Sequence, residues 1–199
     1  MLDAIVIGVG VMGAATLWRA ASRGLHVLGL ERFDVPHAWG SSHGGTRVTR
    51  KAYFEDPRYV PMLHRALDLF RELEAERNAR LYVETGGLHV GAPGHPGIVG
   101  TLRSAREHGL THAVLDSAEI ARRFPAFRAG ADEIGVLEEE AGVLFAERCV
   151  AALAEAALAR GAHVRARTRI LSVEPRADRV VVRTDRDETF EARVAVVAA

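Results

Sequence analysis

The sequence predicts an α/β protein that begins with a strand, a helix and a second strand parallel to the first. An apolar run over residues 4–7 leads into the glycine-rich stretch 8–13, which is followed by a stretch with helical periodicity. A second apolar run, 27–30, ends at the carboxylate of Glu31. This order and spacing match the βαβ pattern that binds dinucleotides.

Each glycine of the turn has a physical role. Gly8 lets the strand turn sharply, and Gly10 lets backbone N–H groups approach a pyrophosphate without a Cβ in the way. Gly13 lets the helix pack close to the strands. The phosphates are expected at the helix N-terminus, where unpaired N–H groups and the helix dipole favour negative charge. Glu31 is expected to accept hydrogen bonds from both hydroxyls of an adenosine ribose, and it would repel the 2′-phosphate of NADP.

The bulk composition is that of an ordinary globular protein. Of the 199 residues, 48% are hydrophobic and 26% are charged, with 26 basic and 26 acidic side chains. The zero net charge gives no support for binding to nucleic acid or to a membrane surface, because either would favour a basic excess. No run approaches the roughly 18 apolar residues of a membrane helix. No basic segment precedes the first strand, so a cytoplasmic protein is expected.

The segment 34–50 is rich in glycine and serine and has no regular period. Irregular segments of this length inside compact domains are usually functional or disordered, and the presence of His43, Arg47 and Arg50 favours a functional one. On residue type alone, the two arginines could instead pair with carboxylates of the helix that starts at Asp56. His43 could likewise be a loop histidine bonded to backbone.

The rest of the chain alternates between helical and strand patterns. Asp56 and Pro57 are a favourable helix start, with Asp as N-cap and Pro at the first helical position. The expected elements are a helix over 11–23 closed by Gly24, a helix from Asp56 to about residue 77, a strand over 81–90 with a bulge or a close approach at its glycine pair, a helix over 97–108, a strand over 113–115, a helix from Ser117 to before Pro125, a helix over 146–160, and strands over 164–173, 180–184, 189–192 and 194–199.

Two clusters of polar residues require separate interpretation. Residues 134–145 contain two short apolar runs around Glu138-Glu139-Glu140, which predicts a hairpin or two strands. A solvated acidic turn is the simpler interpretation of these glutamates, and a metal or amine site is the alternative. His108 and His112 have a spacing seen at metal sites, but Gly109 lies between them, so a surface pair and no metal site are expected.

Cys149 is the only cysteine, so the chain can form no internal disulfide. It lies within the apolar pattern of the helix expected over 146–160, and a buried structural thiol is expected. The final apolar run, 194–199, has no cap, turn or polar tail. A buried strand needs sheet neighbours on both sides, so we expect a truncated protein.

Three passages resemble FAD-dependent amine oxidases of the D-amino acid oxidase superfamily, most closely the branch of monomeric sarcosine oxidase and N-methyltryptophan oxidase. They are residues 4–31, the loop Gly40-Ser41-Ser42-His43-Gly44-Gly45-Thr46-Arg47-Val48-Thr49-Arg50, and the run Gly142-Val143-Leu144-Phe145-Ala146-Glu147-Arg148-Cys149. The resemblance covers nearly the whole chain but only the N-terminal half of a family member. Gly45 stands where relatives often carry an acidic residue, which affects substrate preference rather than flavin binding.

The resemblance implies a Rossmann-like FAD-binding domain with an inserted mixed α+β substrate-binding domain. The FAD-binding domain would be discontinuous and incomplete, over residues 1–83 and 144–199, and the start of the substrate domain would cover 84–143. Residues implied to bind the cofactor are Gly8, Gly10, Val11, Met12, Gly13, Glu31, Arg32, Ser41, Ser42, His43, Gly44, Thr46, Arg47, Ile170 and Ala198. Arg32 could equally lie in solvent, and Ile170 could cover the adenine while being an ordinary core residue.

The implied activity is oxidation of a secondary or N-methyl amino acid. A hydride leaves the carbon next to the substrate nitrogen for the flavin, and oxygen takes the electrons to give hydrogen peroxide. The implied catalytic residues are His43, Arg47 and Arg50. Arg50 would hold the substrate carboxylate, and His43 and Arg47 would place positive charge close to the isoalloxazine.

Other functions compete with this one. Within the superfamily, a glycine or D-amino acid oxidase, or a dehydrogenase with another electron acceptor, is the second choice. An NAD-dependent dehydrogenase is disfavoured because the loop 40–50 follows the second strand where a regular crossover is expected. A non-catalytic truncated dinucleotide-binding fragment is the remaining alternative.

Overall fold

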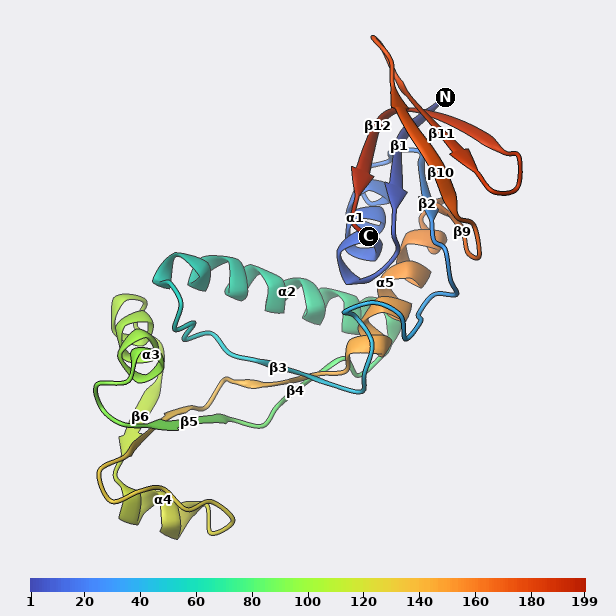
Figure 1. Cartoon of the computed structure of the whole chain (residues 1–199). Coiled ribbons are helices and arrows are strands. Elements are labelled where there is room, and N and C mark those ends of the chain that lie inside the picture. The colour runs from blue at the N-terminus through green and yellow to red at the C-terminus, as the bar shows by residue number, and fades with distance from the viewer. The chain divides into compact units, whose positions relative to one another are not determined.

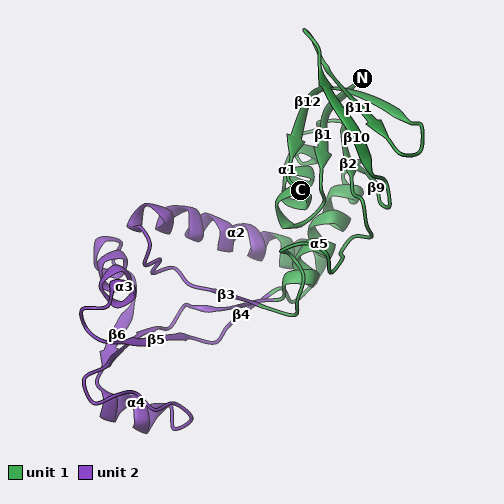
Figure 2. Cartoon of the chain, viewed as in Figure 1, with its two compact units in different colours: residues 1–46, 73–81, 145–199 green, residues 47–72, 82–144 purple.

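The computed structural model describes all 199 residues, and they divide into two compact units (Figure 2). Unit 1 comprises Met1–Thr46, Leu73–Leu81 and Phe145–Ala199. Unit 2 comprises Arg47–Glu72 and Tyr82–Leu144. Segment Arg47–Glu72 thus belongs to unit 2, although the predicted FAD-binding domain includes it, and the assignment of functions to domains stays a prediction.

Unit 1 is built on a six-stranded sheet with the strand order β10-β11-β12-β1-β2-β9 (Figure 1). Strands β12, β1, β2 and β9 run parallel, and β10, β11 and β12 form an antiparallel meander. Helices α1 and α5 pack against each other beside this sheet. The elements are β1 (Leu2–Ile7), α1 (Val11–Ala21), β2 (Val27–Leu30), α5 (Ala146–Ala159), β9 (His163–Arg165), β10 (Ile170–Pro175), β11 (Val180–Thr184) and β12 (Thr189–Val197).

The two faces of the parallel strands bury different partners. Ile5 and Leu28 belong to a core cluster with Val180 and Val182 of β11, so the meander covers one face. On the other face, a Cβ added to Gly29 of β2 would lie 2.6 Å from Leu17 of α1. Successive side chains of a strand point to opposite faces of the sheet, so a strand that is apolar at nearly every position has two apolar faces. Both faces of these strands are therefore buried. The predicted α/β fold with a parallel sheet is confirmed.

Unit 2 contains two three-stranded sheets, with orders β3-β8-β4 and β5-β7-β6. All of their pairings are antiparallel. The last residues of α2 extend into unit 1. The elements are β3 (Arg47–Thr49), a 3₁₀ turn η1 (Pro57–Tyr59), α2 (Val60–Arg77), β4 (Tyr82–Glu84), β5 (Gly87–Gly91), α3 (Pro96–Glu107), β6 (His112–Leu115), α4 (Ser117–Arg123), β7 (Ile134–Glu138) and β8 (Gly142–Leu144).

Two predicted helix starts in unit 2 are confirmed. The Asp56 carboxylate accepts a hydrogen bond from the Arg58 N–H at 2.8 Å, and Pro57 follows as the first helical residue. The first turn is a 3₁₀ turn that continues into α2. Helix α4 has a capping box, in which Asp116 and Glu119 each accept from the other's backbone N–H. The caps therefore supply partners for N–H groups that the helix itself leaves unpaired.

The strand expected over 81–90 is two strands in different sheets, β4 and β5. The break falls at Gly86, whose φ of 70° lies in the left-handed region that favours glycine. A Cβ on Gly87 would lie 2.7 Å from Ala141, so this glycine also permits a close approach. The glycine pair therefore ends one strand and begins another instead of forming a bulge.

The acidic run after β7 is not simply solvated. Glu139 and Glu140 are exposed, but Glu138 is 4% exposed. The predicted solvated turn is therefore wrong for Glu138, because this carboxylate accepts hydrogen bonds from buried backbone. Strands β7 and β8 pair with different sheets, so they are two strands and not a hairpin.

Cys149 is buried in α5, as predicted, with 2% of its surface exposed. Burial raises the pKa of its thiol to about 11, which keeps it protonated at neutral pH. No helix in the structure is both long enough and apolar enough to span a membrane.

Candidate functional site

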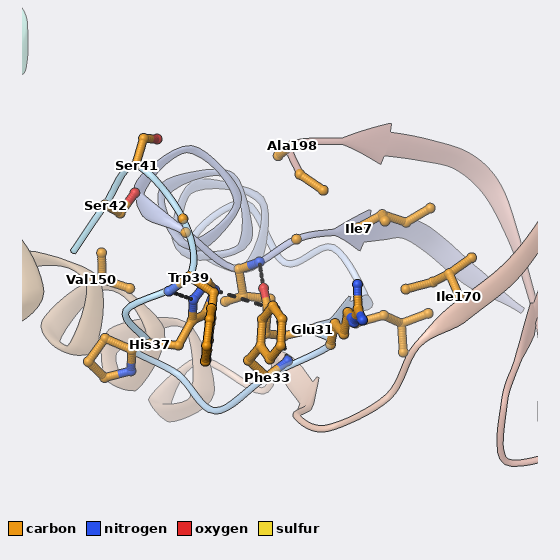
Figure 3. Close-up of a pocket in the computed structure, with 18 residues that line it drawn as sticks. Ile7, Glu31, Phe33, His37, Trp39, Ser41, Ser42, Val150, Ile170 and Ala198 are labelled. Atoms are coloured by element: carbon orange, nitrogen blue, oxygen red, sulfur yellow. Dashed lines mark hydrogen bonds and ion pairs between the residues drawn. The ribbon is translucent and has the colours of Figure 1, made fainter.

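A cavity of about 340 Å³ opens in unit 1 where β1, β2 and β12 end (Figure 3). Crevices at the carboxyl ends of parallel strands are the usual ligand sites of open α/β sheets. Its walls come from the glycine turn, the segment after β2, helix α5 and the start of β10. The lining residues are Ile7, Gly8, Val9, Gly10, Leu30, Glu31, Arg32, Phe33, Pro36, His37, Trp39, Gly40, Ser41, Ser42, Val150, Ile170, Ala198 and Ala199.

The glycine turn is packed too closely for side chains. Gly8 has a φ of 88°, and a Cβ there would lie 2.8 Å from the backbone of Ala199. A Cβ on Gly13 would lie 1.8 Å from the carbonyl oxygen of Gly8, so α1 contacts the turn directly. A Cβ on Gly10 would lie 3.1 Å from the hydroxyl of Ser42. The backbone of the turn is therefore accessible from the cavity because glycine stands at these positions.

The N-terminus of α1 receives its acceptor from outside the helix. Gly10 is the N-cap and has no side chain to accept a hydrogen bond. Instead, the Val11 N–H donates to the Ser42 hydroxyl at 3.1 Å. Figure 3 shows Ser41 and Ser42 on the loop beside the start of this helix. An anion at this point would meet N–H groups at the positive end of the helix dipole.

Glu31 follows β2 directly and is 5% exposed. Its carboxylate accepts hydrogen bonds from the Val9 N–H at 2.8 Å and from the Phe33 N–H at 3.0 Å. The Nε2 atom of His37 lies 3.5 Å from the same carboxylate. A carboxylate has about four acceptor positions, so Glu31 retains capacity for further donors from the cavity.

Aromatic side chains form one wall of the cavity, and the sequence prediction did not include them. Phe33 stacks on Trp39 with ring centroids 5.8 Å apart, and His37 is tilted against Phe33 at 5.0 Å. The guanidinium of Arg32 lies 5.2 Å from the Phe33 centroid. The sequence signal that could have indicated this wall is the group of aromatic residues soon after Glu31. A loop, however, has no periodicity that predicts which of its side chains face inward.

The cavity brings together about half of the predicted cofactor residues. Those that line it are Gly8, Gly10, Glu31, Arg32, Ser41, Ser42, Ile170 and Ala198. Those that do not are Val11, Met12, Gly13, His43, Gly44, Thr46 and Arg47. Met12 is 70% exposed, and the Gly44 N–H donates to the Glu147 carboxylate at 2.9 Å. His43 Nδ1 lies 2.5 Å from the Gly40 carbonyl oxygen, which is the backbone contact that the sequence left open.

Arg47 and Arg50 belong to unit 2. Arg47 begins β3 and is exposed. The guanidinium of Arg50 lies 5.1 Å from the ring centroid of Tyr53 and 4.9 Å from that of Phe54. It also lies 3.5 Å from Glu55, which precedes the N-cap Asp56, so this ion pair is with a carboxylate before the helix and not with one on the helix.

Comparison with known proteins identifies the family. Residues 3–199 match the family described as FAD dependent oxidoreductase. The chain belongs to this family. It is 43% identical over 182 residues to monomeric sarcosine oxidase of Streptomyces avermitilis, covering 92% of this chain and 47% of that protein. Human peroxisomal sarcosine oxidase is 34% identical over 197 residues, with 99% and 50% covered.

One solved structure and a further curated relative give the same result. The open form of NikD, an amino acid oxidase essential for nikkomycin biosynthesis, superposes with a TM-score of 0.88 and 33% identity over 100% of this chain and 51% of NikD. N-methyl-L-tryptophan oxidase of Yersinia pestis is 33% identical over 197 residues. The predicted resemblance to this branch of FAD-dependent amine oxidases is confirmed. The chain spans about half the length of the curated relatives it matches.

FAD is the cofactor of this family of oxidoreductases, and the cavity has features that fit it. A phosphate needs a close approach to backbone N–H groups, which the glycine turn and the start of α1 provide. A ribose needs an acceptor for its hydroxyls, which Glu31 provides. An adenine needs an apolar surface, and Ile7, Leu30 and Ile170 line the cavity.

Proposed function

We propose that the full-length protein is an FAD-dependent amine oxidase that oxidises a secondary or N-methyl amino acid, sarcosine being the simplest example. The reaction transfers a hydride from the carbon next to the nitrogen to the flavin, and oxygen then accepts the electrons to give hydrogen peroxide. One observation carries the proposal: the segment 40–50 supplies Ser42 to the N-terminus of α1 and then continues to Arg50. A single loop thus connects a cofactor cradle to a cation suited to a carboxylate.

The cofactor would be held by groups that need no rearrangement of the fold. Backbone N–H groups at Gly10 and Val11, together with the Ser41 hydroxyl and the backbone of Ser42, would bind the pyrophosphate. The phosphate would replace the Ser42 hydroxyl as acceptor of the Val11 N–H. Glu31 would accept from the ribose hydroxyls. When bound, the flavin ring supplies the hydride-accepting chemistry, which no amino-acid side chain provides.

Arg50 would bind the carboxylate of the substrate. A guanidinium offers a planar fork of N–H donors that matches a carboxylate. The rings of Tyr53 and Phe54 hold this fork by cation–π contacts. The Glu55 carboxyl is 41% exposed and 3.5 Å away, so this ion pair is weak and a substrate can replace it at small cost.

His43 and Arg47 would contribute positive charge near the flavin. Fixed positive charge stabilises negative charge that develops during the reaction. Their role rests on the family resemblance of the loop, because neither side chain lines the cavity of unit 1. Substitution of each by Gln therefore tests them separately from cofactor binding, with the rate of flavin reduction as the readout.

The function is tested by adding sarcosine to the purified full-length protein without oxygen and recording the flavin absorbance. We expect the absorbance to bleach, and readmission of air to restore it with one equivalent of hydrogen peroxide. Glycine, D-alanine and N-methyl-tryptophan in parallel samples identify the preferred amine. A flavin that stays oxidised with every amine contradicts the proposal and favours the non-catalytic alternative, while recovery only with an artificial acceptor favours a dehydrogenase.

Arg50→Ala tests the assignment of the carboxylate ligand. Loss of a charged hydrogen bond worth about 1.5–3 kcal/mol should raise the sarcosine concentration for half-maximal bleaching about 10- to 150-fold. Arg128→Ala is the matched control, because Arg128 is an exposed arginine of the same unit. Unchanged sarcosine affinity in the Arg50 variant would show that another group binds the carboxylate.

Gly10→Val tests the phosphate cradle. An added Cβ meets the Ser42 hydroxyl at 3.1 Å, and the further methyl groups of valine would fill the approach to the turn. The purified variant should lack FAD, whereas Gly94→Ala should retain it, because nothing lies within 4 Å of a Cβ at position 94. If Gly10→Val kept a full complement of flavin, the pyrophosphate would have to bind elsewhere.

A further inference from the structure

Arg50 opens an irregular segment of unit 2 whose next two residues are buried without forming a helix or strand. Residues 50–56 have no regular secondary structure, yet Ala52 is fully buried and Lys51 is 8% exposed. Buried backbone N–H groups outside regular elements still need acceptors. The orientation of Arg50 therefore depends on what accepts from the residues that follow it.

The acceptor is Glu138, the last residue of β7. One oxygen of its carboxylate accepts from the Lys51 N–H at 2.5 Å, and the other accepts from the Ala52 N–H at 3.1 Å. Glu138 is itself 4% exposed, so both bonds lie away from solvent. Hydrogen bonds to an ionised acceptor are roughly twice as strong as neutral ones. A buried charge is thus used to fix the two peptide groups directly after Arg50.

The nearby cation of Lys51 does not compete with the backbone for the Glu138 carboxylate, because it pairs with another glutamate. The ammonium group of Lys51 pairs with Glu140. Glu138 is anchored at the sheet, because it pairs with Gly87 of β5 on one side and with His112 of β6 on the other. The side chain therefore extends from a strand that both neighbours hold in register.

Helix α3 fixes the far end of the same segment. The Ser104 hydroxyl donates to the Tyr53 carbonyl oxygen at 2.5 Å. A Cβ on Gly100 would lie 2.0 Å from the Phe54 carbonyl oxygen, so the helix packs directly on the chain there. Tyr53 and Phe54 are the two rings that hold the Arg50 guanidinium. Glu138 fixes the near end of the segment in the same way that α3 fixes the far end.

Arg50 and Glu138 also line one cavity of about 120 Å³ in unit 2, together with His89 and Thr101. The Nε atom of Arg50 is buried and has no hydrogen-bond partner. Burial and the nearby Arg50 charge lower the pKa of His89, which therefore adds no positive charge at neutral pH. Arg50 is the cation of this cavity, and its direction is set by backbone that Glu138 holds.

We propose that Glu138 is the positioning residue for Arg50: through the N–H groups of Lys51 and Ala52 it holds the guanidinium in the orientation that binds the substrate carboxylate. This inference rests on the proposed function of Arg50. Glu138 itself acts through the backbone and touches neither substrate nor cofactor. Its loss should weaken carboxylate binding while leaving the flavin and its reduction intact.

The test uses the full-length protein with bound FAD and measures the dissociation constant of acetate from the change in flavin absorbance. Glu138→Gln keeps the shape but replaces one acceptor oxygen by an NH₂ group that faces an N–H donor. We expect acetate and sarcosine to bind about tenfold more weakly. The rate of flavin reduction at saturating sarcosine should stay within about threefold of wild type, since the bound substrate still meets the same flavin.

Two variants accompany it. Glu139→Gln is the matched control, because Glu139 is the exposed neighbour in the same acidic run, and it should bind acetate like wild type. Glu138→Asp keeps the charge on a shorter side chain and should recover part of the acetate affinity lost in Glu138→Gln. This partial rescue separates the charge from the mere presence of a polar side chain.

The outcomes separate this inference from the function on which it rests. Weak acetate binding in both Arg50→Ala and Glu138→Gln, with full FAD content, supports it. Wild-type acetate binding in Glu138→Gln, together with weak binding in Arg50→Ala, overturns it and leaves the proposed function standing. Wild-type binding in Arg50→Ala shows that another group binds the carboxylate, and it overturns the inference together with the proposed role of Arg50. If neither Glu138 variant folds with FAD, Glu138 has a general structural role and the inference is overturned.

Discussion

Glu31 in unit 1 and Glu138 in unit 2 are buried glutamates at the end of a strand, and each accepts hydrogen bonds from two backbone N–H groups. Glu31 accepts from Val9 and Phe33, at 2.8 and 3.0 Å. Glu138 accepts from Lys51 and Ala52, at 2.5 and 3.1 Å. In both cases an ionised acceptor fixes irregular chain that no neighbouring strand could pair with.

The two sites differ in what surrounds the carboxylate. Glu31 lines a cavity of about 340 Å³ and retains acceptor capacity for a ligand. Glu138 lines a cavity of about 120 Å³, and both of its oxygens are bonded to the segment that begins at Arg50. In the proposed roles, a buried carboxylate would bind a ligand directly in unit 1 and would position another side chain in unit 2.

The largest expected difference is in stability. Glu138→Ala would leave two buried N–H groups unsatisfied, at about 1–3 kcal/mol each. Glu31→Ala should destabilise the flavin-free protein by about half as much, because water can enter the larger cavity and bond to the exposed groups. Urea unfolding followed by circular dichroism measures both losses. Equal losses would show that the two carboxylates are equivalent in their access to water.

The second difference is in cofactor affinity. Glu31→Gln should weaken FAD binding about 10- to 150-fold, through loss of about 1.5–3 kcal/mol from charged hydrogen bonds to the ribose. Glu138→Gln should leave FAD affinity unchanged. Titration of flavin-free protein with FAD, followed by flavin fluorescence, gives both constants. A comparable loss in the Glu138 variant would contradict the separation of roles proposed for the two glutamates.

Sequence reasoning placed Glu31 correctly at the end of a strand and misjudged the burial of Glu138, for a physical reason. The first carboxylate ends a pattern of strand, glycines, helix and strand that is contained in residues 4–31. One of its donors, Val9, lies within that pattern, and the other, Phe33, lies two residues beyond it. Local periodicity and spacing therefore predicted the fold of unit 1 and a large part of its cavity. The glycines at 8, 10 and 13 were informative because each excludes a Cβ for a separate steric reason.

Glu138 has donors that lie 87 and 86 residues away along the chain. A run of three glutamates predicts a solvated turn when read locally, and no pattern near residue 138 indicates that Lys51 and Ala52 are its partners. Trp39 was missed for a related reason, because the inward face of an irregular loop depends on tertiary contacts. Long-range partners of irregular backbone are the part of this molecule that residue patterns do not encode.

A smaller effect is expected at the N-terminus of α1, where the acceptor is neutral. Ser42→Ala removes the acceptor of the Val11 N–H and should destabilise the flavin-free protein by about 1 kcal/mol, the usual loss for a capping group. With saturating FAD the loss should shrink, because a phosphate would replace the hydroxyl as acceptor. Thermal unfolding with and without FAD measures this. A loss that grows with FAD would show that the hydroxyl also binds the cofactor.

The smallest effect concerns pH and belongs to unit 2. The hydrogen bond from Lys51 is the main cause that lowers the pKa of Glu140 from its ordinary value of 4.5. A carboxyl whose pKa is lower in the folded state than in the unfolded state stabilises the folded state at pH values above the unfolded pKa. This stabilisation is lost as the pH falls through the folded pKa. The stability gap between wild type and Lys51→Met should therefore narrow as the pH falls below about 4.5.

The gap should narrow by less than about 1 kcal/mol, because the Glu140 carboxyl is 48% exposed and water screens the pair. Urea unfolding at a series of pH values measures it, with Glu139→Gln as the control that should show no such narrowing. If the gap stayed constant across the series, the pair of Lys51 and Glu140 would contribute nothing to stability. Of Glu138 and Glu140, only Glu138 would then stabilise the segment after Arg50. The comparison of the two units would in that case concern Glu31 and Glu138 alone.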